Sequence, residues 1–351
     1  MAISRNADPP QRVLVKEVNW LGDLVFSLPA VKAVRQAYPN AHLAVLIKRE
    51  LAGFFDGARW IDEVMPYRIA PRLAGVADRW RVVTAIRARQ FDLAIVLPRS
   101  FEAAFWVALA GVPCRAGFAA DARGPLLTHS VTRPSSVPAQ HQMYEYLHLL
   151  RATLHIDSDA PDTHLDIHEP HRERMRAWLQ QTRRRPQDRL IALATAAAYG
   201  PAKEWPESHF GILIDQLAEH HGVECVLVGA PSERAKSERI AAGSRHGALV
   251  AAGETTVGEL IALLSLCDGF AGNDSGSLHV AAAVGIPTLG LYGSTNPART
   301  GPLGARTATI YRQIECAPCL ERTCRFGHYR CLTQIGPDDV ITALCELGAL
   351  G

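Results

Sequence analysis

The sequence has no long apolar run, because none of its hydrophobic stretches reaches the roughly 20 residues that a membrane-spanning helix needs. Positive and negative charges nearly cancel, and the formal net charge is +2. A general nucleic-acid binder would carry a strong basic excess, so we expect no nucleic acid as a partner. The first ten residues also lack the apolar core of a secretion signal. These absences predict a cytoplasmic protein.

Two common nucleotide-binding motifs are also missing. No G-x-G-x-x-G turn follows the first predicted strand of either half, and no G-x-x-x-x-G-K-[ST] loop occurs. Dinucleotide-dependent dehydrogenases and P-loop nucleotide hydrolases are therefore disfavoured. The eight cysteines are unevenly spread, which fits reduced thiols in the cytoplasm better than a disulfide scaffold.

The length of 351 residues suits two domains of roughly 150 residues each. Strand-like apolar runs alternate with helical patterns in both halves, and this alternation is typical of doubly wound α/β domains with parallel sheets. The predicted strands lie at 12–18, 42–47, 63–67 and 91–97, then at 189–194, 223–228, 248–252, near 270, and at 288–292. A polar stretch at 157–170 reads as the connection. We place the first domain at 1–165 and the second at 166–335.

One polar turn, GNDSGSLH at 272–279, stands between a short apolar strand and the helix-forming segment 280–284. Two glycines let the backbone turn closely there. The first amides of the following helix lack partners, and with the helix dipole they favour an anion. An ordinary strand-to-helix turn, with Asp274 or Ser275 as the helix cap, fits the same residues.

Several segments together resemble glycosyltransferase family 9. They are NWLGDL at 19–24 with SLPA at 27–30, YGPAKEWP at 199–206, GAPSE at 229–233, GNDSG at 272–276 and LYGSTNPARTGP at 291–302. A cysteine-rich stretch at 316–332 resembles the corresponding stretch of those family members that are the second heptosyltransferases of the lipopolysaccharide core. The resemblance spans nearly the whole chain.

This resemblance implies a GT-B fold, in which two doubly wound, Rossmann-like α/β domains face each other across a cleft. It implies inverting, metal-independent transfer of L-glycero-D-manno-heptose from ADP-heptose to the first heptose of the inner core, with heptosyl-Kdo-lipid A as acceptor and no cofactor. A peripheral position at the anionic inner-membrane surface is then expected. The terminal helix, in 336–351, is expected to pack back toward the first domain. A family 9 enzyme with a different acceptor, a nucleotide-sugar epimerase and a non-catalytic binding protein are the alternatives.

Two residues carry the predicted chemistry. Asp23 follows the first strand, and by resemblance its carboxylate is the base that takes the proton from the attacking hydroxyl. The same position also suits a helix cap. Lys203 lies in a loop after a strand, and its ammonium would stabilise the negative charge that grows on the leaving diphosphate. A surface lysine on a mobile loop is the alternative.

Further donor-binding residues are predicted beside Lys203. Thr195 and Tyr199 would add hydroxyl donors from the same loop. Glu233 follows the strand at 223–228 and would accept the ribose hydroxyls, a role that acids take in related nucleotide sites and that the resemblance supports. Capping of the next helix is the alternative for Glu233.

The polar turn supplies the rest of the donor site. Backbone amides at the helix start, which comprises Ser275, Gly276, Ser277 and Leu278, would hold the diphosphate. Asp274 would repel a phosphate, so we predict that it binds sugar hydroxyls or orients His279 or backbone amides. His279 also suits a core histidine.

The predicted acceptor-binding residues are Asn19, Arg99, Arg115 and Arg123. The three arginines lie near strand ends, where their guanidinium groups would pair with carboxylate or phosphate oxygens. Six further arginines lie between 68 and 89 against the single acid Asp78. They suit either an anionic lipid surface or a solvated helix face.

Two patterns raise the question of a metal. The C-x2-C-x4-C-x6-C spacing of Cys316, Cys319, Cys324 and Cys331 is compatible with zinc or an iron–sulfur cluster. We predict reduced thiols instead, because the second half lacks the regular pair of a zinc ribbon, and redox or disulfide roles are further alternatives. The D-S-D run at 157–159 matches the pattern of metal-dependent sugar transferases but reads as a solvated linker.

Overall fold

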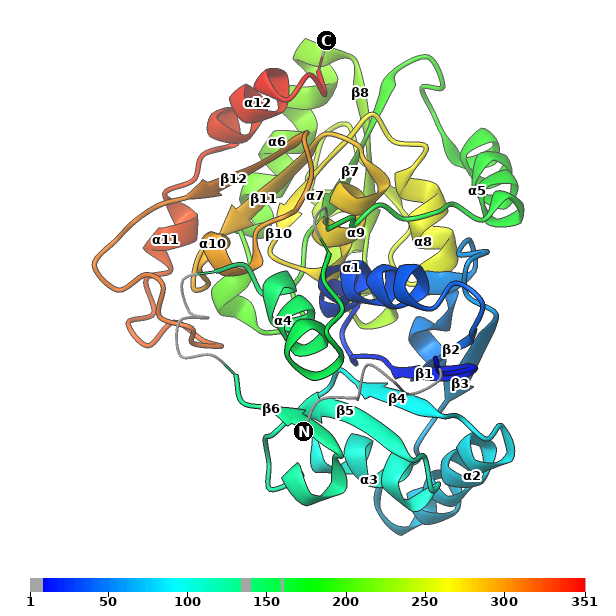
Figure 1. The fold of residues 1–351 in the computed structure, drawn as a ribbon. Helices are drawn as coiled ribbons and strands as arrows, with labels where there is room; N and C mark the ends of the chain where they lie inside the picture. The colour runs from blue at the N-terminus through cyan, green and yellow to red at the C-terminus, as the bar shows by residue number, and fades with distance from the viewer. Residues whose placement is uncertain (1–8, 134–139, 159–160, 351) are drawn as a thin grey trace. The chain divides into compact units, whose positions relative to one another are not determined.

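The computed structural model describes residues 9–133, 140–158 and 161–350. It divides into two compact units, Met1–Thr163 and His164–Gly351 (Figure 1). The division lies close to the boundary that we placed after residue 165. Within the described ranges, no helix combines the length and the apolar character needed to cross a bilayer.

The first unit is built on six parallel strands in the order β3-β2-β1-β4-β5-β6. The strands are β1 (Arg12–Lys16), β2 (His42–Lys48), β3 (Glu63–Tyr67), β4 (Leu93–Val96), β5 (Cys114–Phe118) and β6 (His129–Val131). The helices are α1 (Leu21–Ala37), η1 (Arg49–Phe55), η2 (Arg72–Ala74), α2 (Gly75–Ala88), α3 (Phe101–Leu109), η3 (Gly124–Leu126) and α4 (Met143–Leu154).

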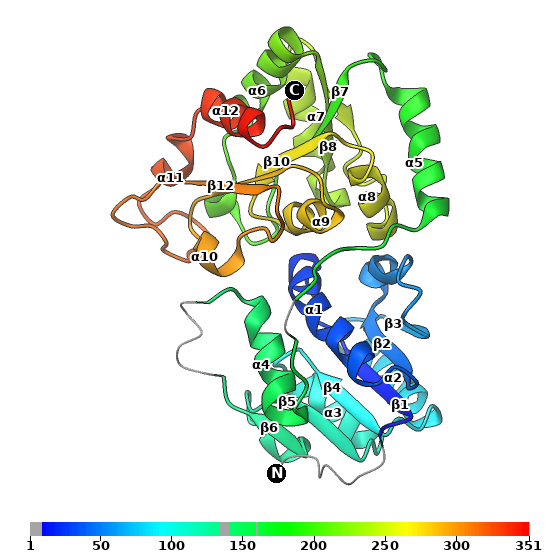
Figure 2. The same cartoon turned by 45° about the horizontal axis from the view of Figure 1, so that its top comes forward.

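Helices cover both faces of this sheet. Side chains of α2 and α3 share a core with Leu14, Ala44 and Ala94 of the strands, while α1 packs with α4 on the other face (Figure 2). Burial on both faces explains why β4 is apolar throughout rather than alternating.

The second unit repeats this plan, with six parallel strands in the order β12-β11-β10-β7-β8-β9. The strands are β7 (Arg189–Ala194), β8 (Val223–Val228), β9 (Leu249–Val250), β10 (Gly269–Asn273), β11 (Thr288–Tyr292) and β12 (Thr307–Tyr311). The longer helices are α5 (Glu169–Thr182), α6 (Glu207–His221), α7 (Arg234–Gly243), α8 (Val257–Leu264), α9 (Gly276–Val284) and α12 (Pro337–Glu346). The short ones are η5 (Pro201–Lys203), η6 (Pro231–Glu233), α10 (Pro297–Thr300) and α11 (Arg330–Thr333).

The terminal helix α12 packs within the second unit, against α6, β10 and β11. Its Val340 and Leu344 are fully buried in that unit's core. The apolar stripe of this helix thus finds its hydrophobic partners in the sheet and helix of its own unit. Packing of the helix toward the first domain stays a prediction.

Both sheets share one topology. When the strands are counted from the start of each unit, the order is 3-2-1-4-5-6, so the first and fourth strands are neighbours. In such sheets ligands bind beyond the carboxyl ends of these two strands, where the connections diverge. The pairs Lys16 with Val96 and Ala194 with Gly272 mark these two places. The sequence patterns did not predict β5, β6 or β12, and β9 is shorter than the predicted strand at 248–252.

Candidate active site

In the second unit, the loops after β7 and β10 meet beyond the carboxyl ends of these two strands, where the connections of the sheet diverge. Lys203 ends η5 in the first loop, and Asp274 directly follows β10. Lys203 Nζ lies 2.5 Å from Asp274 Oδ2. Thr295 Oγ1 donates a hydrogen bond of 2.6 Å to the same oxygen, and His279 Nε2 lies 3.6 Å from Oδ1. The structure thus brings the predicted residues Lys203, Asp274 and His279 together and adds Thr295, which the sequence patterns missed.

The charges in this cluster are largely removed from water. The side chains of Lys203 and Asp274 are only 13% and 4% exposed. Burial raises the pKa of Asp274, but the hydrogen bond from His279 and the charge of Lys203 more than offset this and lower it to about 2. Asp274 is therefore ionised at neutral pH. It contacts both Lys203 and His279, and its predicted role, binding sugar hydroxyls or orienting His279 or backbone amides, stays a prediction.

The start of α9 is the second feature of this half-site. Ser275 is the N-cap residue, but its side chain makes no capping hydrogen bond, and among the described residues its Oγ is buried without a partner. Gly276, Ser277 and Leu278 form the first turn, whose amides have no partner inside the helix. Ser275 thus occupies the N-cap position that the alternative gave it, but its side chain satisfies none of these amides, and the helix start keeps the properties of an anion site.

The other predicted donor residues have assigned contacts. Tyr199 donates its hydroxyl to the carbonyl of Leu320 at 2.5 Å, so this group holds a neighbouring segment, whereas its ring lies 4.9 Å from Lys203 Nζ. Thr195 is buried, with Oγ1 3.5 Å from Ser237 Oγ. Both hydroxyls therefore already have a protein partner. These contacts do not support our prediction that Tyr199 and Thr195 donate hydrogen bonds to the sugar nucleotide.

Glu233 lies in the turn between β8 and α7. Its Oε2 accepts a 2.8 Å hydrogen bond from the amide of Ala230, and burial raises the pKa of this carboxyl. A Cβ on Gly229 would lie 2.4 Å from Oε2, so the glycine makes room for the acid. Glu233 thus caps its own turn through one oxygen, and its role toward ribose stays a prediction.

In the first unit, Asn19 and Asp23 follow β1. Asp23 lies in the first turn of α1, where Gln142 Nε2 donates a hydrogen bond of 3.1 Å to its Oδ1. Behind it, Glu17 Oε2 accepts from Ser27 Oγ at 2.9 Å. Burial raises the pKa of Glu17 to about 7, and the charge of Asp23 contributes to this rise. Asp23, the base predicted from sequence, therefore lies beyond the carboxyl end of β1, where the connections of the first sheet diverge.

A basic cavity opens next to Asn19. Its volume is about 710 Å³, and Asn19 Oδ1 accepts a hydrogen bond of 3.0 Å from Tyr67, another lining residue. Its charged lining residues are Lys48, Arg49, Glu50, Arg68, Arg72, Arg79 and Glu102. Five cations against two acids make it suited to an anionic ligand. Lys48 and Arg49 were not among the predicted acceptor residues, although they directly follow a predicted strand, and that position was the signal that could have identified them.

Most arginines of the stretch 68–89 form ion pairs or hydrogen bonds within the first unit. Arg79 pairs with Glu102, Arg81 with Asp78 and Arg89 with Glu63. Arg87 donates to the carbonyl of Leu109 at 2.5 Å. These contacts favour the solvated, ion-paired helix face over a face reserved for lipid.

Two predicted acceptor arginines are structural. Arg123 is fully buried, and its guanidinium donates to the carbonyls of Phe118 at 2.7 Å and Ser100 at 3.2 Å. Arg115 donates to the carbonyls of Leu126 at 2.6 Å and Val112 at 2.5 Å. These corrections share one reason: loop carbonyls that lack sheet partners need donors, and a guanidinium supplies several in one plane. Arg99, just beyond β4, is exposed and stays a candidate.

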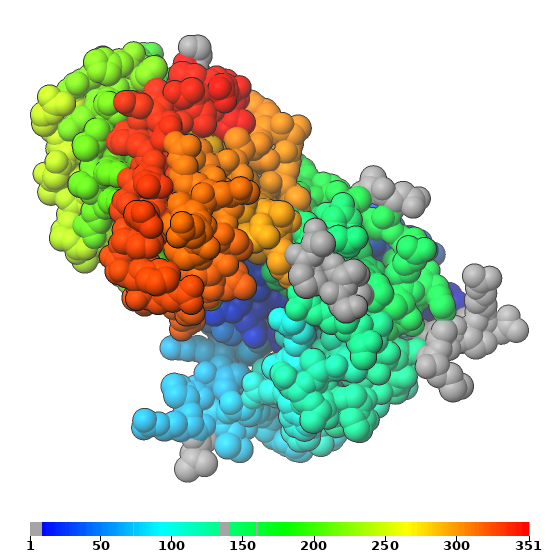
Figure 3. Space-filling model, turned by 90° about the vertical axis from the view of Figure 1, so that its left-hand side faces the viewer, coloured from blue at the N-terminus to red at the C-terminus, as the bar shows by residue number. Residues whose placement is uncertain are grey.

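The cysteine-rich segment lies at the surface of the second unit, in the orange to red part of Figure 3. All four of its cysteines are free thiols. Cys331 belongs to the core cluster, and burial together with the neighbouring Cys316, Cys319 and Cys324 raises the pKa of its thiol. Across the described residues, no group of three or more His, Cys, Asp or Glu side chains is arranged to hold a metal ion. Asp159 of the D-S-D run lies outside the described residues.

Comparison with known proteins finds similarity over most of the chain. The model of "Glycosyltransferase family 9 (heptosyltransferase)" matches residues 79–330. Lipooligosaccharide heptosyltransferase 2 of Haemophilus ducreyi is 28% identical over 350 residues, covering 96% of this chain and 99% of that protein.

Solved structures show the same fold. E. coli ADP-heptose LPS heptosyltransferase II has a TM-score of 0.81 at 25% identity, covering 96% of this chain and 98% of its own. E. coli heptosyltransferase WaaC with ADP-2-deoxy-2-fluoro heptose has a TM-score of 0.71 at 19% identity, covering 95% and 99%. The predicted GT-B class, with two Rossmann-like α/β domains, is confirmed.

Proposed function

Since this chain belongs to glycosyltransferase family 9, the heptosyltransferase family, we propose that it catalyses the heptosyltransferase II reaction. In this reaction L-glycero-D-manno-heptose passes from ADP-heptose to the first heptose of the inner core of lipopolysaccharide, with heptosyl-Kdo-lipid A as acceptor. The extended similarity to a heptosyltransferase 2 supports this specificity.

The observation that carries the proposal is the buried Lys203–Asp274 pair beside the start of α9. The leaving group is a nucleoside diphosphate, whose negative charge grows as the sugar departs. An ammonium held by a carboxylate, together with unpartnered helix amides, provides preorganised positive charge for it. The bound ADP-heptose analogue of E. coli WaaC, a protein of the same fold, supports this choice of donor.

The acceptor side of the proposal rests on Asp23. The acceptor hydroxyl oxygen forms a bond to the anomeric carbon of heptose from the face opposite ADP, while the bond from that carbon to the diphosphate oxygen breaks. Asp23 takes the hydroxyl proton, and ADP leaves with the bonding electron pair. Attack from the opposite face inverts the anomeric configuration. The cations around Asn19 would bind the carboxylates and phosphates of the acceptor core.

The test is an assay with two acceptors. Purified protein is incubated with ADP-heptose and either Kdo-lipid A or heptosyl-Kdo-lipid A, and both ADP release and product mass are measured. We expect one added heptose on the second acceptor only. Transfer to the first acceptor alone would assign a different family 9 specificity, and ADP-heptose consumed without any acceptor would contradict transfer.

Peripheral contact with the anionic inner membrane is part of the proposal, because the acceptor is a lipid. Co-sedimentation with vesicles of phosphatidylglycerol and phosphatidylethanolamine, with and without acceptor, measures it. Binding that requires the acceptor would mean that the protein contacts the membrane through acceptor held in the basic cavity. Binding to plain vesicles would mean that the protein surface itself contacts the lipid headgroups.

A further inference from the structure

The segment that leads into α4 lies against the start of α1. The ring of His141 meets that of Phe26 edge-on, with centroids 4.8 Å apart. The next residue, Gln142, donates from Nε2 to Asp23 Oδ1 at 3.1 Å, across 119 positions of sequence. Two neighbouring contacts therefore dock this segment onto the turn that carries the carboxylate.

The hydrogen bonds also determine the orientation of the Gln142 carboxamide. Its Nε2 lies 3.3 Å from Tyr146 Oη as well as 3.1 Å from the carboxylate. An ionised carboxylate only accepts hydrogen bonds, and an amide nitrogen has two N–H groups to give. Both donors therefore have an acceptor, and the amide is held from two sides.

Helix α4 provides a rigid base for this arrangement. Leu149 and Leu150 are fully buried, and Tyr146 is 7% exposed. Burial and then the charge of Asp23 raise the pKa of the Tyr146 phenol far above its ordinary value, so the phenol stays neutral. Glu145, also buried, pairs with Arg133 at 2.5 Å. The amide of Gln142 is thus presented from a packed element.

We propose that Gln142 is a positioning residue for the carboxylate of Asp23, an inference that rests on the proposed role of Asp23 as the base. A base acts only when its oxygen is held in line with the proton, and a misplacement of about 1 Å costs roughly 100-fold in rate. The hydrogen bond from the Gln142 amide to Oδ1 helps to hold the carboxylate in place for the acceptor hydroxyl.

The test replaces the donor with a side chain of nearly the same shape. Gln142→Met is compared with wild type in the heptosyl-Kdo-lipid A assay. We expect kcat to fall between about 10-fold and 100-fold, with the KM for ADP-heptose and the melting temperature unchanged. Tyr144→Phe, on the exposed side of the same helix, serves as the matched control and should keep the wild-type kcat.

A second variant tests whether a loss of activity in Gln142→Met could come from a packing defect. Gln142→Glu also lacks the donor, and its charge lies at the N-terminus of α4, where the helix dipole favours it. It should therefore fold, yet its carboxylate repels Asp23, so kcat should again fall. The double variant Asp23→Asn/Gln142→Met should be no slower than Asp23→Asn alone, because the two residues act as one unit.

The outcomes separate the two hypotheses. An inactive Asp23→Asn with a fully active Gln142→Met would overturn the positioning role and leave the proposed function intact. An active Asp23→Asn would overturn the base itself. Additive losses in the double variant would assign Gln142 a role that does not act through Asp23, which also contradicts the inference.

Discussion

At the scale of single residues, the donor half-site depends on a buried charge that has compensating partners. Asp274 is 4% exposed, and Lys203, Thr295 and His279 surround its two oxygens. Removing one partner of such a pair leaves an uncompensated charge in a medium that solvates it poorly. The diphosphate contact proposed for Lys203 therefore predicts that stability and ADP binding change together when this residue is replaced.

Lys203→Ala should lower both properties. We expect a loss of about 3 kcal/mol in stability and a loss of roughly 10- to 100-fold in ADP affinity, the scale of a charge-assisted hydrogen bond. Thermal melting and calorimetric ADP titration measure these effects. Lys236→Ala, which breaks a pair with the more exposed Glu204, is the control. Lys203→Ala/Asp274→Asn should recover the melting temperature but not the ADP affinity. Wild-type ADP affinity in Lys203→Ala would show that the ammonium does not bind the diphosphate.

Asp23→Asn should abolish turnover while keeping the donor site. The amide has nearly the same shape but cannot take a proton, so we expect kcat to fall by about 100-fold to 10,000-fold. ADP affinity should stay within about twofold, since Asp23 lies in the other unit from the Lys203 cluster. The ADP-release assay and an ADP titration check the two effects. Asp121→Asn, at an exposed position of the same unit, should behave as wild type.

At the scale of elements, the loop of Lys203 is held by the cysteine-rich segment. Ala202 N donates to the carbonyl of Arg322 at 3.0 Å, and Tyr199 Oη donates to that of Leu320 at 2.5 Å. Leu320 N in turn donates to the carbonyl of Ser294 at 2.8 Å. The segment thus ties the loop after β7 to the loop after β11. This gives the segment a scaffolding role for the loop of Lys203.

Gly200 lies against the backbone of the cysteine-rich segment. It has a φ of +145°, and a Cβ there would lie 2.5 Å from the Arg322 carbonyl oxygen. Gly200→Ala should therefore displace the loop, reduce kcat and ADP affinity by about tenfold or more, and lower the melting temperature. Activity, ADP titration and melting are the measurements. Gly243→Ala, at a site with nothing within 4 Å and no positive φ, should change little. Unchanged ADP affinity in Gly200→Ala would mean that the segment does not hold Lys203 in place.

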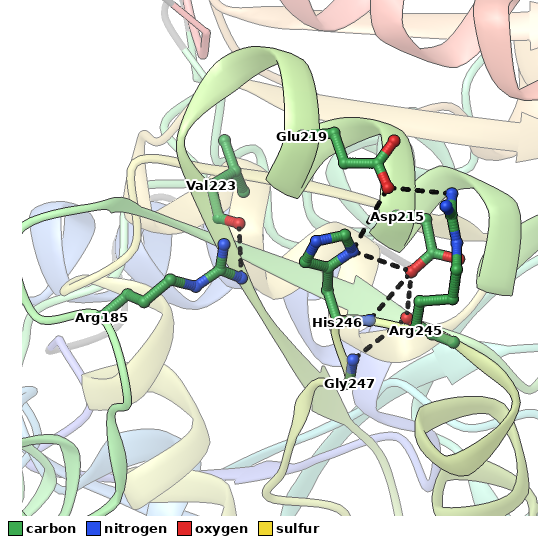
Figure 4. Close-up of polar contacts among 8 residues, drawn as sticks. Arg185, Asp215, Glu219, Val223, Arg245, His246 and Gly247 are labelled. Atoms are coloured by element: carbon green, nitrogen blue, oxygen red, sulfur yellow. Dashed lines mark hydrogen bonds and ion pairs between the residues drawn. The ribbon is translucent and has the colours of Figure 1, made fainter.

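At the scale of the whole molecule, the second unit has its proposed donor site at one edge of its sheet and a structural network at the other. In the second unit, Asp215 of α6 joins the segment between α7 and β9 (Figure 4). Its Oδ1 accepts from Ser244 Oγ at 2.7 Å and from His246 N at 3.0 Å. The nearby Arg185 binds the carbonyl of Val223 at the start of β8. This network stands at the amino edge of the strands, opposite the donor half-site.

Asp215 should contribute stability that depends on pH. Burial raises its pKa, but hydrogen bonds from Ser244 and His246 outweigh this and lower it to about 2. The unfolded value is about 3.9, so the folded state gains roughly 2.5 kcal/mol above that pH, and the gain disappears as pH falls through 2. Asp215→Asn should melt lower than wild type at pH 7, with about half the difference left at pH 3. Glu238→Gln, half-exposed in its ion pair, should show little difference at either pH. An equal gap at both pH values would contradict the linkage.

The sequence by itself determined the local and repetitive features. Alternating apolar runs predicted two α/β domains, because strands buried on both faces read as continuous hydrophobic segments. The turn at 272–279 predicted a helix start suited to anions, since its glycines and unpartnered amides are local properties. Short motifs that resemble those of family 9 predicted Asp23 as the base and Lys203 as the contact of the leaving diphosphate.

Tertiary structure alone decided which distant groups meet. Lys203 and Asp274 are 71 positions apart, and they touch because β7 pairs with β10 on one side as well as with β8, the next strand in sequence, on the other. The contact of Gln142 with Asp23 likewise requires α4 to pack on α1. Tertiary packing also buried Arg123 among carbonyls and kept α12 in its own unit. Parallel sheets join strands through long crossovers, so the strand order, and every site built on it, is determined by packing and not by neighbouring sequence.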